Sequence, residues 1–356
     1  MRVVVAGGGT AGHIEPAMNL ADELMRRDSH TVITALGTTR GMEVTLIPER
    51  GYSLELIPAV PMPRKINFDL LTLPLRLYQT VKRTRDIIES TNADVVVGFG
   101  GYVSMPAYFA ARGRVPIVIH EANARAGLAN RIGARFADRV AESFVGSLPS
   151  AVLTGIPLRR SIEQFDKAQL RDEARTYFGI TGDDLVVLVF GGSQGAARLN
   201  SVLRQVLESK HPQGIVFLHA FGPKNEPVSQ ASPGYIPVPY ISRMDLAYAA
   251  SDFALCRSGA MTVAEVTAVG LPACFVPLPI GNGEQSLNAA AVVAAGGAIA
   301  CADEQFTASF VVDTVLPIVR DRVRRELMSS VARKFGNQDA SARLADLVTN
   351  VVQEHS

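Results

Sequence analysis

Short apolar runs alternate with helical patterns along the whole chain. In the first half, these runs predict strands near residues 2–6, 31–36, 53–57, 94–98, 116–120 and 138–141. The runs are continuous stretches of Val, Ile and Leu, which is typical of strands that are covered by helices on both faces. Helical patterns separate most of the strands, and this order favours a parallel sheet.

The second half of the chain starts the same pattern again. Strands are predicted near residues 185–190, 215–219, 252–255 and 273–276, and helices near 196–208, 243–250, 260–269 and 284–295. We place the boundary near residue 158, which gives domains of residues 1–158 and 159–340 and a final helix, 341–356, that packs back on the first domain. The predicted fold class is α/β, with two doubly wound Rossmann-like domains facing a cleft.

Composition narrows the range of partners only slightly. The 356 residues include 35 basic and 34 acidic side chains, so no global field favours nucleic acid, and an anionic ligand must be bound by a local site. Cys256, Cys274 and Cys301 form no CxxC pair and have apolar flanks, which predicts reduced, buried thiols and fits a cytosolic protein. We expect neither a signal peptide nor a membrane-spanning helix, because the apolar runs are too short.

Three glycine-rich turns each connect a predicted strand to a predicted helix. Their sequences are GGGTAG at 7–12, GFGGYVS at 98–104 and GGSQG at 191–195. Glycines let the backbone approach a ligand closely, and the helix that follows offers unpaired N–H groups and the positive end of its dipole. The turns therefore predict two phosphate-bearing ligands, held by two similar domains.

Two other interpretations of these turns are disfavoured. The first turn fits G-x-G-x-x-G, but the second strand ends at Gly37 without the acidic residue that binds the ribose of NAD, and no arginine stands there for a 2′-phosphate. The third turn fits the G-x-S-x-G elbow of serine hydrolases, but His211 and His219 precede any plausible acid at a later strand end, and His355 lies in the terminal tail. Ser193 is better interpreted as a hydroxyl donor to a phosphate oxygen.

Longer motifs around these turns resemble the MurG family of bacterial N-acetylglucosaminyltransferases, which belongs to glycosyltransferase family 28. In matching order from residue 7 to residue 289, the similar segments are GGGTAGHIEP, FGGYVSMPA, HEANARAGLAN, TGIPLRR, GGSQGAARLN, CRSGAMTVAE and GNGEQSLNA. The resemblance implies a glycosyltransferase B fold and a role in peptidoglycan synthesis, and through it in cell shape and division. It also implies inverting transfer of N-acetylglucosamine from UDP to the C4 hydroxyl of the muramoyl residue of lipid I, forming lipid II.

The resemblance assigns donor binding mainly to the second domain. Its donor-binding residues are Thr10, Ala11, Gly12, Asn123, Arg159, Ser193, Ile241, Ala260, Met261, Thr262, Val263, Ala264, Glu265 and Gln285. Glu265 resembles the ribose-binding carboxylate, although a first-turn glutamate favoured by the helix dipole is the simpler alternative. Asn200, Ser258 and Gly259 are supporting residues. No cofactor is expected, and the absence of an Asp-x-Asp motif predicts that helix N-termini and hydroxyls, without a metal, stabilise the diphosphate.

The same resemblance assigns the acceptor to the first domain. Its residues there are Gly9, His13, Gly100, Gly101 and Tyr102. His13 is the leading candidate for general base or acceptor-phosphate contact, because a neutral imidazole takes up a proton near pH 7. His120 and Glu121 are rival candidates at a strand end, where a carboxylate could equally fix a loop.

Three positions depart from the family pattern. Ala11 replaces a glycine, Ile156 stands where an asparagine is usual, and Glu284 occupies a position that glutamine often holds. If position 11 requires a positive φ, Ala11 carries a strain of about 1 kcal/mol.

The segment from Lys65 to Arg85 combines a surplus of apolar positions with basic neighbours. Its candidate membrane patch consists of Leu71, Leu75, Tyr78, Val81, Lys82 and Arg83. We therefore expect a peripheral enzyme on an anionic membrane, at the cytoplasmic face of the bacterial plasma membrane, with other cell-wall or division proteins as further partners. A buried helix with a solvated basic edge is the alternative for this segment. For the whole chain, three alternatives remain open: a UDP-sugar epimerase, another glycosyltransferase B enzyme that uses a different acceptor, and a non-catalytic nucleotide-binding module.

Overall fold

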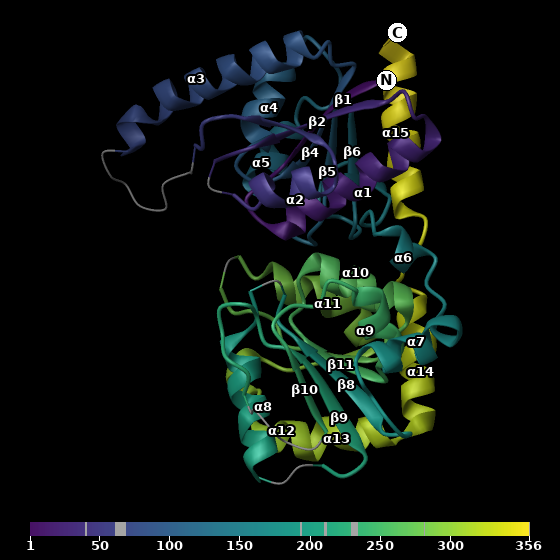
Figure 1. The fold of residues 1–356 in the computed structure, drawn as a ribbon. Helices are drawn as coiled ribbons and strands as arrows, with labels where there is room; N and C mark the ends of the chain where they lie inside the picture. The colour runs from purple at the N-terminus through teal and green to yellow at the C-terminus, as the bar shows by residue number, and fades with distance from the viewer. Residues whose placement is uncertain are drawn as a thin grey trace. The chain divides into compact units, whose positions relative to one another are not determined.

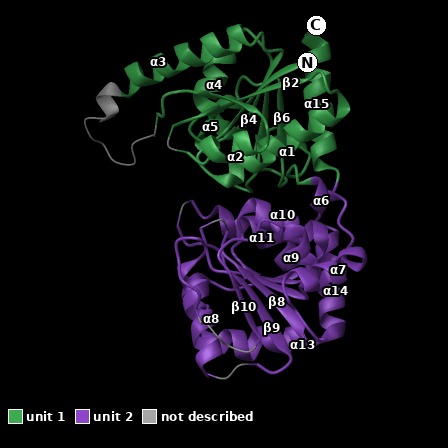
Figure 2. Cartoon of the chain, viewed as in Figure 1, with its two compact units in different colours: residues 1–159, 339–356 green, residues 160–338 purple. Residues whose placement is uncertain are grey.

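The computed structural model describes residues 1–39, 41–60, 69–192, 194–209, 212–228, 234–280 and 282–355, with the backbone alone at residues 69–72. Two compact units divide the chain (Figure 2). Unit 1 comprises Met1–Arg159 and Asp339–Ser356, and unit 2 comprises Arg160–Gln338. Each unit is built around one parallel sheet.

Unit 1 contains a seven-stranded sheet in the order β3-β2-β1-β4-β5-β6-β7. Its strands are β1 Arg2–Gly7, β2 Val32–Gly37, β3 Ser53–Leu56, β4 Val95–Gly100, β5 Ile117–Glu121, β6 Arg139–Glu142 and β7 Val152–Leu153. Its helices are α1 Ala11–Arg27, α2 Glu43–Glu49, α3 Asp69–Ser90, α4 Ser104–Ala111, α5 Leu128–Gly133 and α15 Ala340–His355.

Side chains of β1 alternate between the two faces of this sheet, and both faces are covered by helices (Figure 1). Val3 and Val5 belong to the core cluster under α1, α2 and α15. Val4 and Ala6 belong to the cluster under α3 and α4. Burial on both faces explains why the strands are continuous apolar runs.

Unit 2 contains a six-stranded sheet in the order β10-β9-β8-β11-β12-β13. Its strands are β8 Leu185–Phe190, β9 Ile215–Ala220, β10 Tyr235–Val238, β11 Phe253–Cys256, β12 Ala273–Phe275 and β13 Ala298–Ala300. Its helices are α6 Arg160–Glu163, α7 Lys167–Tyr177, α8 Ala197–Ser209, α9 Met244–Ala250, α10 Ala260–Val269, α11 Glu284–Ala294, η1 Asp303–Gln305, α12 Ala308–Phe310, the π-helical turn η2 Val311–Val315, α13 Leu316–Arg320 and α14 Arg322–Arg333.

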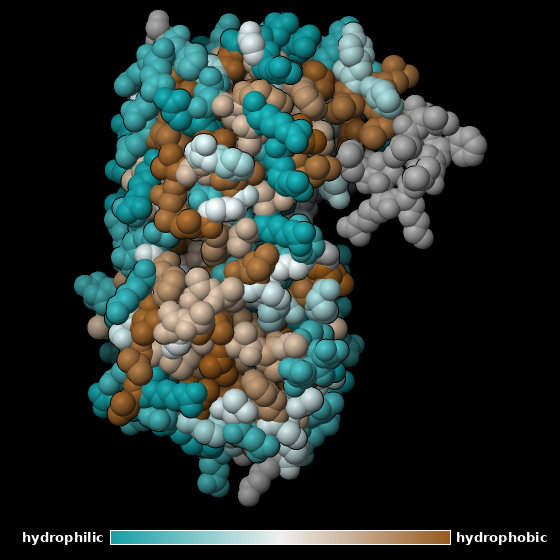
Figure 3. Space-filling view, turned by 180° about the vertical axis from the view of Figure 1, so that it is seen from behind, coloured by the Kyte–Doolittle hydropathy of each residue, from teal (hydrophilic) through white to brown (hydrophobic). Residues whose placement is uncertain are grey.

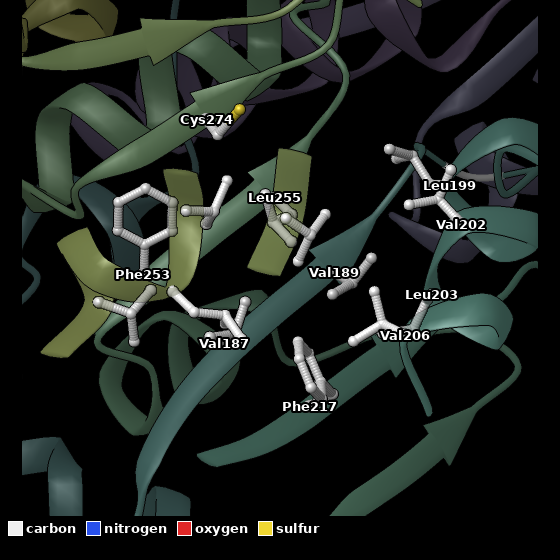
Figure 4. Close-up of a cluster of buried hydrophobic side chains, with 14 of the residues drawn as sticks. Val187, Val189, Leu199, Val202, Leu203, Val206, Phe217, Phe253, Leu255 and Cys274 are labelled. Atoms are coloured by element: carbon white, nitrogen blue, oxygen red, sulfur yellow. The ribbon is translucent and has the colours of Figure 1, made fainter. Parts of the chain in front are cut away.

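The core of unit 2 lies between its central strands and α8 (Figure 4). Val187 and Val189 of β8 and Leu255 of β11 meet the apolar face of α8, from which Leu199 and Val206 project. In both units the first strand lies inside the sheet, and strand order reverses beside it. This reversal opens a ligand-binding position beyond the carboxyl ends of the strands in doubly wound sheets.

The predicted α/β fold class is confirmed, and the predicted strands occur within one or two residues of their expected ends. The hydrophobic pattern did not predict β7, β10 and β13, which are strands of only two to four residues. Cys256, Cys274 and Cys301 are free and buried, as predicted.

Polar side chains cover much of each unit's surface. The face shown in Figure 3 carries hydrophilic side chains with apolar ones interspersed. Within the described ranges, no helix is both long enough and apolar enough to cross a membrane.

The C-terminal helix α15 is part of the unit 1 core and packs against α1. Leu344 is fully buried there, whereas Asn350 of the same helix is exposed. We expect Leu344→Ala to lower the free energy of unfolding of unit 1 by about 2–5 kcal/mol, because it leaves a cavity. Asn350→Ala should change this free energy by less than about 0.5 kcal/mol. Urea denaturation followed by circular dichroism compares the two, and equal effects would mean that α15 does not hold the core.

Candidate functional site

The first two glycine-rich turns pack directly on one another at the carboxyl ends of β1 and β4. Gly101 has φ +85°, and a Cβ there would lie 2.1 Å from the Gly8 carbonyl oxygen. Gly100, with φ +93°, lies against the His13 ring, where a Cβ would come within 3.2 Å of Nε2. The Ser104 hydroxyl donates to the carbonyls of Ala6 and Gly100 and ties the two turns together. These contacts require glycine and bring the predicted acceptor residues into one place.

Helix α1 begins at Ala11 and has an open N-terminus. Its N-cap residue, Thr10, is extended and makes no capping hydrogen bond with its side chain. The N–H groups of the first turn are therefore oriented for an anion. Ala11 does not have a positive φ, because among the described non-glycine residues only Asn92 and Ser150 do, so the strain that a positive φ would cause does not arise. Ala11 is simply the first helical residue, and right-handed helical geometry suits alanine.

His13 lies in the first turn of α1, partly exposed, with Nδ1 3.3 Å from the Thr10 hydroxyl. Burial lowers the pKa of His13 below its usual value, against a hydrogen bond with the Gly8 backbone and the charge of Glu43, which both raise it. His13 is consequently neutral at pH 7 and able to accept a proton.

Glu43, at the start of α2, is a residue that the sequence patterns did not single out. Its side chain is fully buried, and neither carboxylate oxygen has a hydrogen-bond partner among the described residues. A Cβ on Gly8 would lie 2.6 Å from Glu43 Oε1, so the carboxylate abuts the first glycine-rich turn. The only sequence feature that could have indicated this role is the position of an acidic residue shortly after the second strand.

The rival candidates His120 and Glu121 are held inside unit 1. His120 is fully buried, and its Nε2 lies 2.8 Å from the Gly155 carbonyl. Burial lowers the pKa of His120 to about 4. The Glu121 carboxylate accepts hydrogen bonds from the Asn123 and Gly127 backbones and from the Asn130 side chain. Burial raises the pKa of Glu121, and these donors oppose the shift.

Asn130 completes this network, and the motif HEANARAGLAN contains it without revealing its role. Its amide group donates to the His120 carbonyl and to Glu121, while its oxygen accepts from the Tyr108 hydroxyl. Glu121 therefore fixes the loop after β5, which is the structural alternative that the sequence left open. Asn123, predicted to contact the donor sugar, is oriented by the same carboxylate.

In unit 2, the third glycine-rich turn packs against the loop that follows β9. A Cβ on Gly195 would lie 2.2 Å from the Phe221 carbonyl oxygen. Asn200 donates to this carbonyl and also contacts His219, and Asn225 binds the carbonyls of Gln194 and Phe221. Asn200 thus supports the turn, and Asn225 is a further support that the sequence did not indicate. Ser193 lies outside the described residues.

The junction of β11 and α10 offers a second uncapped helix N-terminus. Gly259 is the N-cap and supplies no side chain, so the amides of Ala260, Met261 and Thr262 face outward from the helix start. Ser258 is fully buried, and its hydroxyl has no partner among the described residues. Arg257 donates through Nη1 to the Val276 carbonyl and pairs with Asp303, whereas its Nε has no partner in the described part of the chain.

The other donor candidates of unit 2 surround this junction. Glu265, on α10, accepts a 2.7 Å hydrogen bond from the Tyr248 hydroxyl. Gln285, on α11, accepts from the Leu278 backbone through Oε1, which fixes the orientation of its amide group. Ile241 is buried before α9. The Asn288 amide binds the Ser258 carbonyl, a contact that the sequence did not predict.

Three predicted positions have clear local contacts. Arg159 forms an ion pair with Glu15 of α1 at 2.8 Å, inside unit 1. Ile156 is buried, so the departure from asparagine places an apolar side chain in the core. Glu284 is the first residue of α11 and accepts from the Asn282 backbone. An acidic residue in this first turn is favoured by the helix dipole.

Helix α3 presents part of the predicted membrane patch to solvent. Leu75 and Tyr78 are 61% and 67% exposed, one turn apart, and Lys82 follows on the same side of the helix. Val81 instead packs against the core of unit 1. Arg83 pairs with Glu55 at 3.5 Å. The Leu71 side chain lies outside the described residues.

A cavity of about 450 Å³ lies next to the first glycine-rich turn of unit 1. Gly9, Thr38, Ala59, Arg76 and Tyr102 are among its lining residues. Within the described residues, no group of three or more His, Cys, Asp or Glu side chains is arranged to hold a metal ion.

Two doubly wound units with uncapped helix N-termini at their carboxyl edges are suited to phosphate-bearing ligands, and the match to glycosyltransferase domains in both units identifies the class as a two-domain glycosyltransferase. The chain belongs to glycosyltransferase family 28. The N-terminal domain of that family matches residues 3–142, and its C-terminal domain matches residues 186–344.

Known proteins similar to this chain agree with this family. A Streptomyces avermitilis protein named UDP-N-acetylglucosamine--N-acetylmuramyl-(pentapeptide) pyrophosphoryl-undecaprenol N-acetylglucosamine transferase is 57% identical over 358 residues, covering 99% of each chain. The crystal structure of Acinetobacter baumannii MurG matches with a TM-score of 0.78 and 27% identity, over 98% of this chain and 99% of that one. Neisseria meningitidis UDP-GlcNAc 2-epimerase matches with a TM-score of 0.69 and 14% identity, over 98% and 100%, which shows a shared fold alone.

Proposed function

We propose that this enzyme transfers N-acetylglucosamine from UDP-N-acetylglucosamine to the C4 hydroxyl of the muramoyl residue of lipid I, with inversion, in peptidoglycan biosynthesis. One observation carries the proposal. The N-terminus of α10 is uncapped in a chain of glycosyltransferase family 28, and beside it the buried Ser258 hydroxyl and Arg257 Nε have no partner among the described residues. Buried polar atoms without partners are rare in native proteins, and a ligand that pairs with them removes their cost.

The diphosphate of UDP fits the start of α10. Backbone amides of Ala260 to Thr262 and the Ser258 hydroxyl donate to its oxygens, and the helix dipole adds positive potential. As UDP departs, negative charge grows on the oxygen of its terminal phosphate. Donors that are already oriented toward that oxygen stabilise the transition state without reorganising.

Glu265 and Gln285 are suited to hydroxyl groups of the donor. The Glu265 carboxylate, which accepts a hydrogen bond from Tyr248, is assigned to the ribose hydroxyls. Because the backbone holds Oε1 of Gln285, its NH₂ group is left to donate, and it is assigned to the sugar.

In unit 1, the pyrophosphate of lipid I is assigned to the two interlocked glycine-rich turns and the start of α1. His13 is assigned as the general base. A neutral imidazole takes the proton of the C4 hydroxyl as the oxygen attacks the anomeric carbon, and the nearby Glu43 carboxylate stabilises the imidazolium that forms. The rival candidates have structural partners instead, since His120 Nε2 lies 2.8 Å from the Gly155 carbonyl and Glu121 already accepts several donors.

Radiolabelled transfer from UDP-N-acetylglucosamine to lipid I tests the activity. We expect labelled lipid II, one UDP released per sugar transferred, and the same rate in EDTA. UDP-N-acetylglucosamine incubated alone should be unchanged, whereas an epimerase would convert it to its 2-epimer. Protein that binds UDP but transfers nothing would contradict the proposal, and a loss caused by EDTA alone would contradict the metal-free mechanism.

Kinetics of His13→Ala test the base. We expect kcat to fall by roughly 10²- to 10⁴-fold with the acceptor saturating, while donor affinity stays unchanged. In the wild type the rate should fall in acid with a midpoint below 6.5, because burial lowers the pKa of His13 and the base works only when unprotonated. His30→Ala, an exposed histidine of the same unit, is the control. An unchanged kcat in His13→Ala would exclude His13 as the general base.

Peripheral membrane binding is assigned to the exposed side of α3, where Leu75 and Tyr78 stand beside Lys82. We expect Leu75→Ser/Tyr78→Ser to weaken binding to phosphatidylglycerol vesicles by roughly tenfold or more, because less apolar surface is buried. Val145→Ser removes an apolar side chain that is 83% exposed elsewhere in unit 1 and should leave vesicle binding intact. Co-sedimentation measures both. An equal loss of vesicle binding in Val145→Ser and in the α3 variant would argue against α3 as the membrane-binding helix.

A further inference from the structure

A second cavity, of about 1160 Å³, lies in unit 2 at the amino edge of its sheet. Among its lining residues are Leu185, the first residue of β8, and Asp252 and Pro272, which immediately precede β11 and β12. The third glycine-rich turn and the start of α10 instead follow the carboxyl ends of β8 and β11. Because the strands are parallel, the cavity opens at the opposite edge from the proposed donor site.

Basic side chains dominate the charge of this cavity. Five of them line it against three acidic ones, which leaves a net charge of +2. The basic residues are Lys167 and Arg171 of α7 and Arg322, Arg325 and Arg333 of α14.

The three carboxylates are already engaged. Asp252 lies 3.1 Å from Arg171 and 3.8 Å from Lys167, and it also accepts from the Val186 backbone. Asp166 caps α7, and Glu326 pairs with Arg322. Among the described residues, this leaves Arg325 and Arg333 without a carboxylate partner.

These two arginines are held on the wall of the cavity. They project from one face of α14, which also contributes Arg322 and Ser329 at helical spacing. The Arg325 guanidinium donates to the Val319 carbonyl. Arg333 packs over Gly270, where a Cβ would lie 2.4 Å from its Nε. Two guanidinium groups fixed in this way are suited to the planar, bidentate recognition of phosphate.

The positive charge of the cavity also acts on the neighbouring Lys167, although burial has the larger effect on its pKa. Lys167 has its pKa lowered to about 8, first by burial and then by repulsion from Arg171, Arg325 and Arg333, against the attraction of Asp252. The C-terminal end of α10 also meets Arg333 at Gly270, but a helix terminus supplies only about half a negative charge. The lining of the cavity therefore keeps a net positive charge after its carboxylates and the end of α10 are taken into account.

We propose that this cavity is an anion site of unit 2 in addition to the start of α10, and that it binds a small phosphate-bearing molecule between Arg325 and Arg333. The phosphate groups take the guanidinium donors. Leu185, Leu271 and Pro272 supply an apolar wall for the uncharged part of the ligand. A concave cavity of this size suits a small molecule better than a flat membrane surface.

Calorimetric titration with tripolyphosphate tests the proposal, with UDP at saturation so that the proposed donor site is filled. Any binding to the glycine-rich turns of unit 1, the proposed acceptor site, should be the same in the wild type and the variants. For the cavity we expect one site in the wild type and at least roughly tenfold weaker binding in Arg325→Gln/Arg333→Gln, since two charged hydrogen-bond donors are lost. Arg324→Gln removes one positive charge from a position of α14 outside the cavity and should bind as the wild type does. Unchanged UDP affinity and an unchanged melting temperature show that the variants are folded.

Two results would overturn the proposal. One is no tripolyphosphate binding at millimolar concentration, and the other is equal weakening in Arg324→Gln and the double variant. If the double variant does not fold, wild-type crystals soaked in tungstate decide, because the anomalous signal must lie between Arg325 and Arg333. Signal only at the start of α10 would also refute the site. Since UDP binding is measured separately, failure here leaves the proposed transferase activity untouched.

Discussion

The structure depends on one constraint, the unpaired backbone N–H groups at the start of every helix. In a parallel sheet, helices that follow strands begin at the carboxyl edge, and their first amides point away from the helix. Helices α1 and α10, which follow β1 and β11, have no side-chain cap. By contrast, α7 and α14 do not directly follow strands and are capped by Asp166 and Asp321. Uncapped amides are therefore concentrated at the carboxyl edge of each sheet, where we propose that the two diphosphates bind.

Glycine keeps these amides accessible, and the reason differs between the turns. In unit 1, two turns interlock, since Gly101 lies against the Gly8 carbonyl and Gly100 lies against His13. In unit 2, Gly195 meets the Phe221 carbonyl, which Asn200 and Asn225 hold. A side chain at Gly101 or Gly195 would push the turn away from its neighbour. The same residues thus shape the fold and the surface that a phosphate approaches.

Local patterns in the sequence predicted much of the fold and marked the glycine-rich turns of the candidate site, because strands and turns depend on neighbouring residues. Continuous apolar runs marked the strands, and glycines marked the turns. The edge strand β10 was missed because it is short and contains Pro237, which cannot donate to a sheet ladder. The sequence also did not predict the specific contacts between side chains and turns. Nothing in the sequence near Glu121 indicates that Asn130 and Gly127 satisfy its carboxylate, and nothing near Gly8 indicates that Glu43 lies beside it.

Helix α10 gives unit 2 two chemically distinct ends. Its N-terminus, at Gly259, carries partial positive charge beside Ser258, and its C-terminus, at Gly270, carries partial negative charge beside Arg333. Tyr248 lies between the two regions, since it lines the basic cavity while its hydroxyl binds Glu265 in the middle of α10. The carboxyl edge presents amides and hydroxyls, which suit a diphosphate whose charge changes during a reaction. The amino edge presents fixed guanidinium groups, which suit an anion that binds and leaves unchanged.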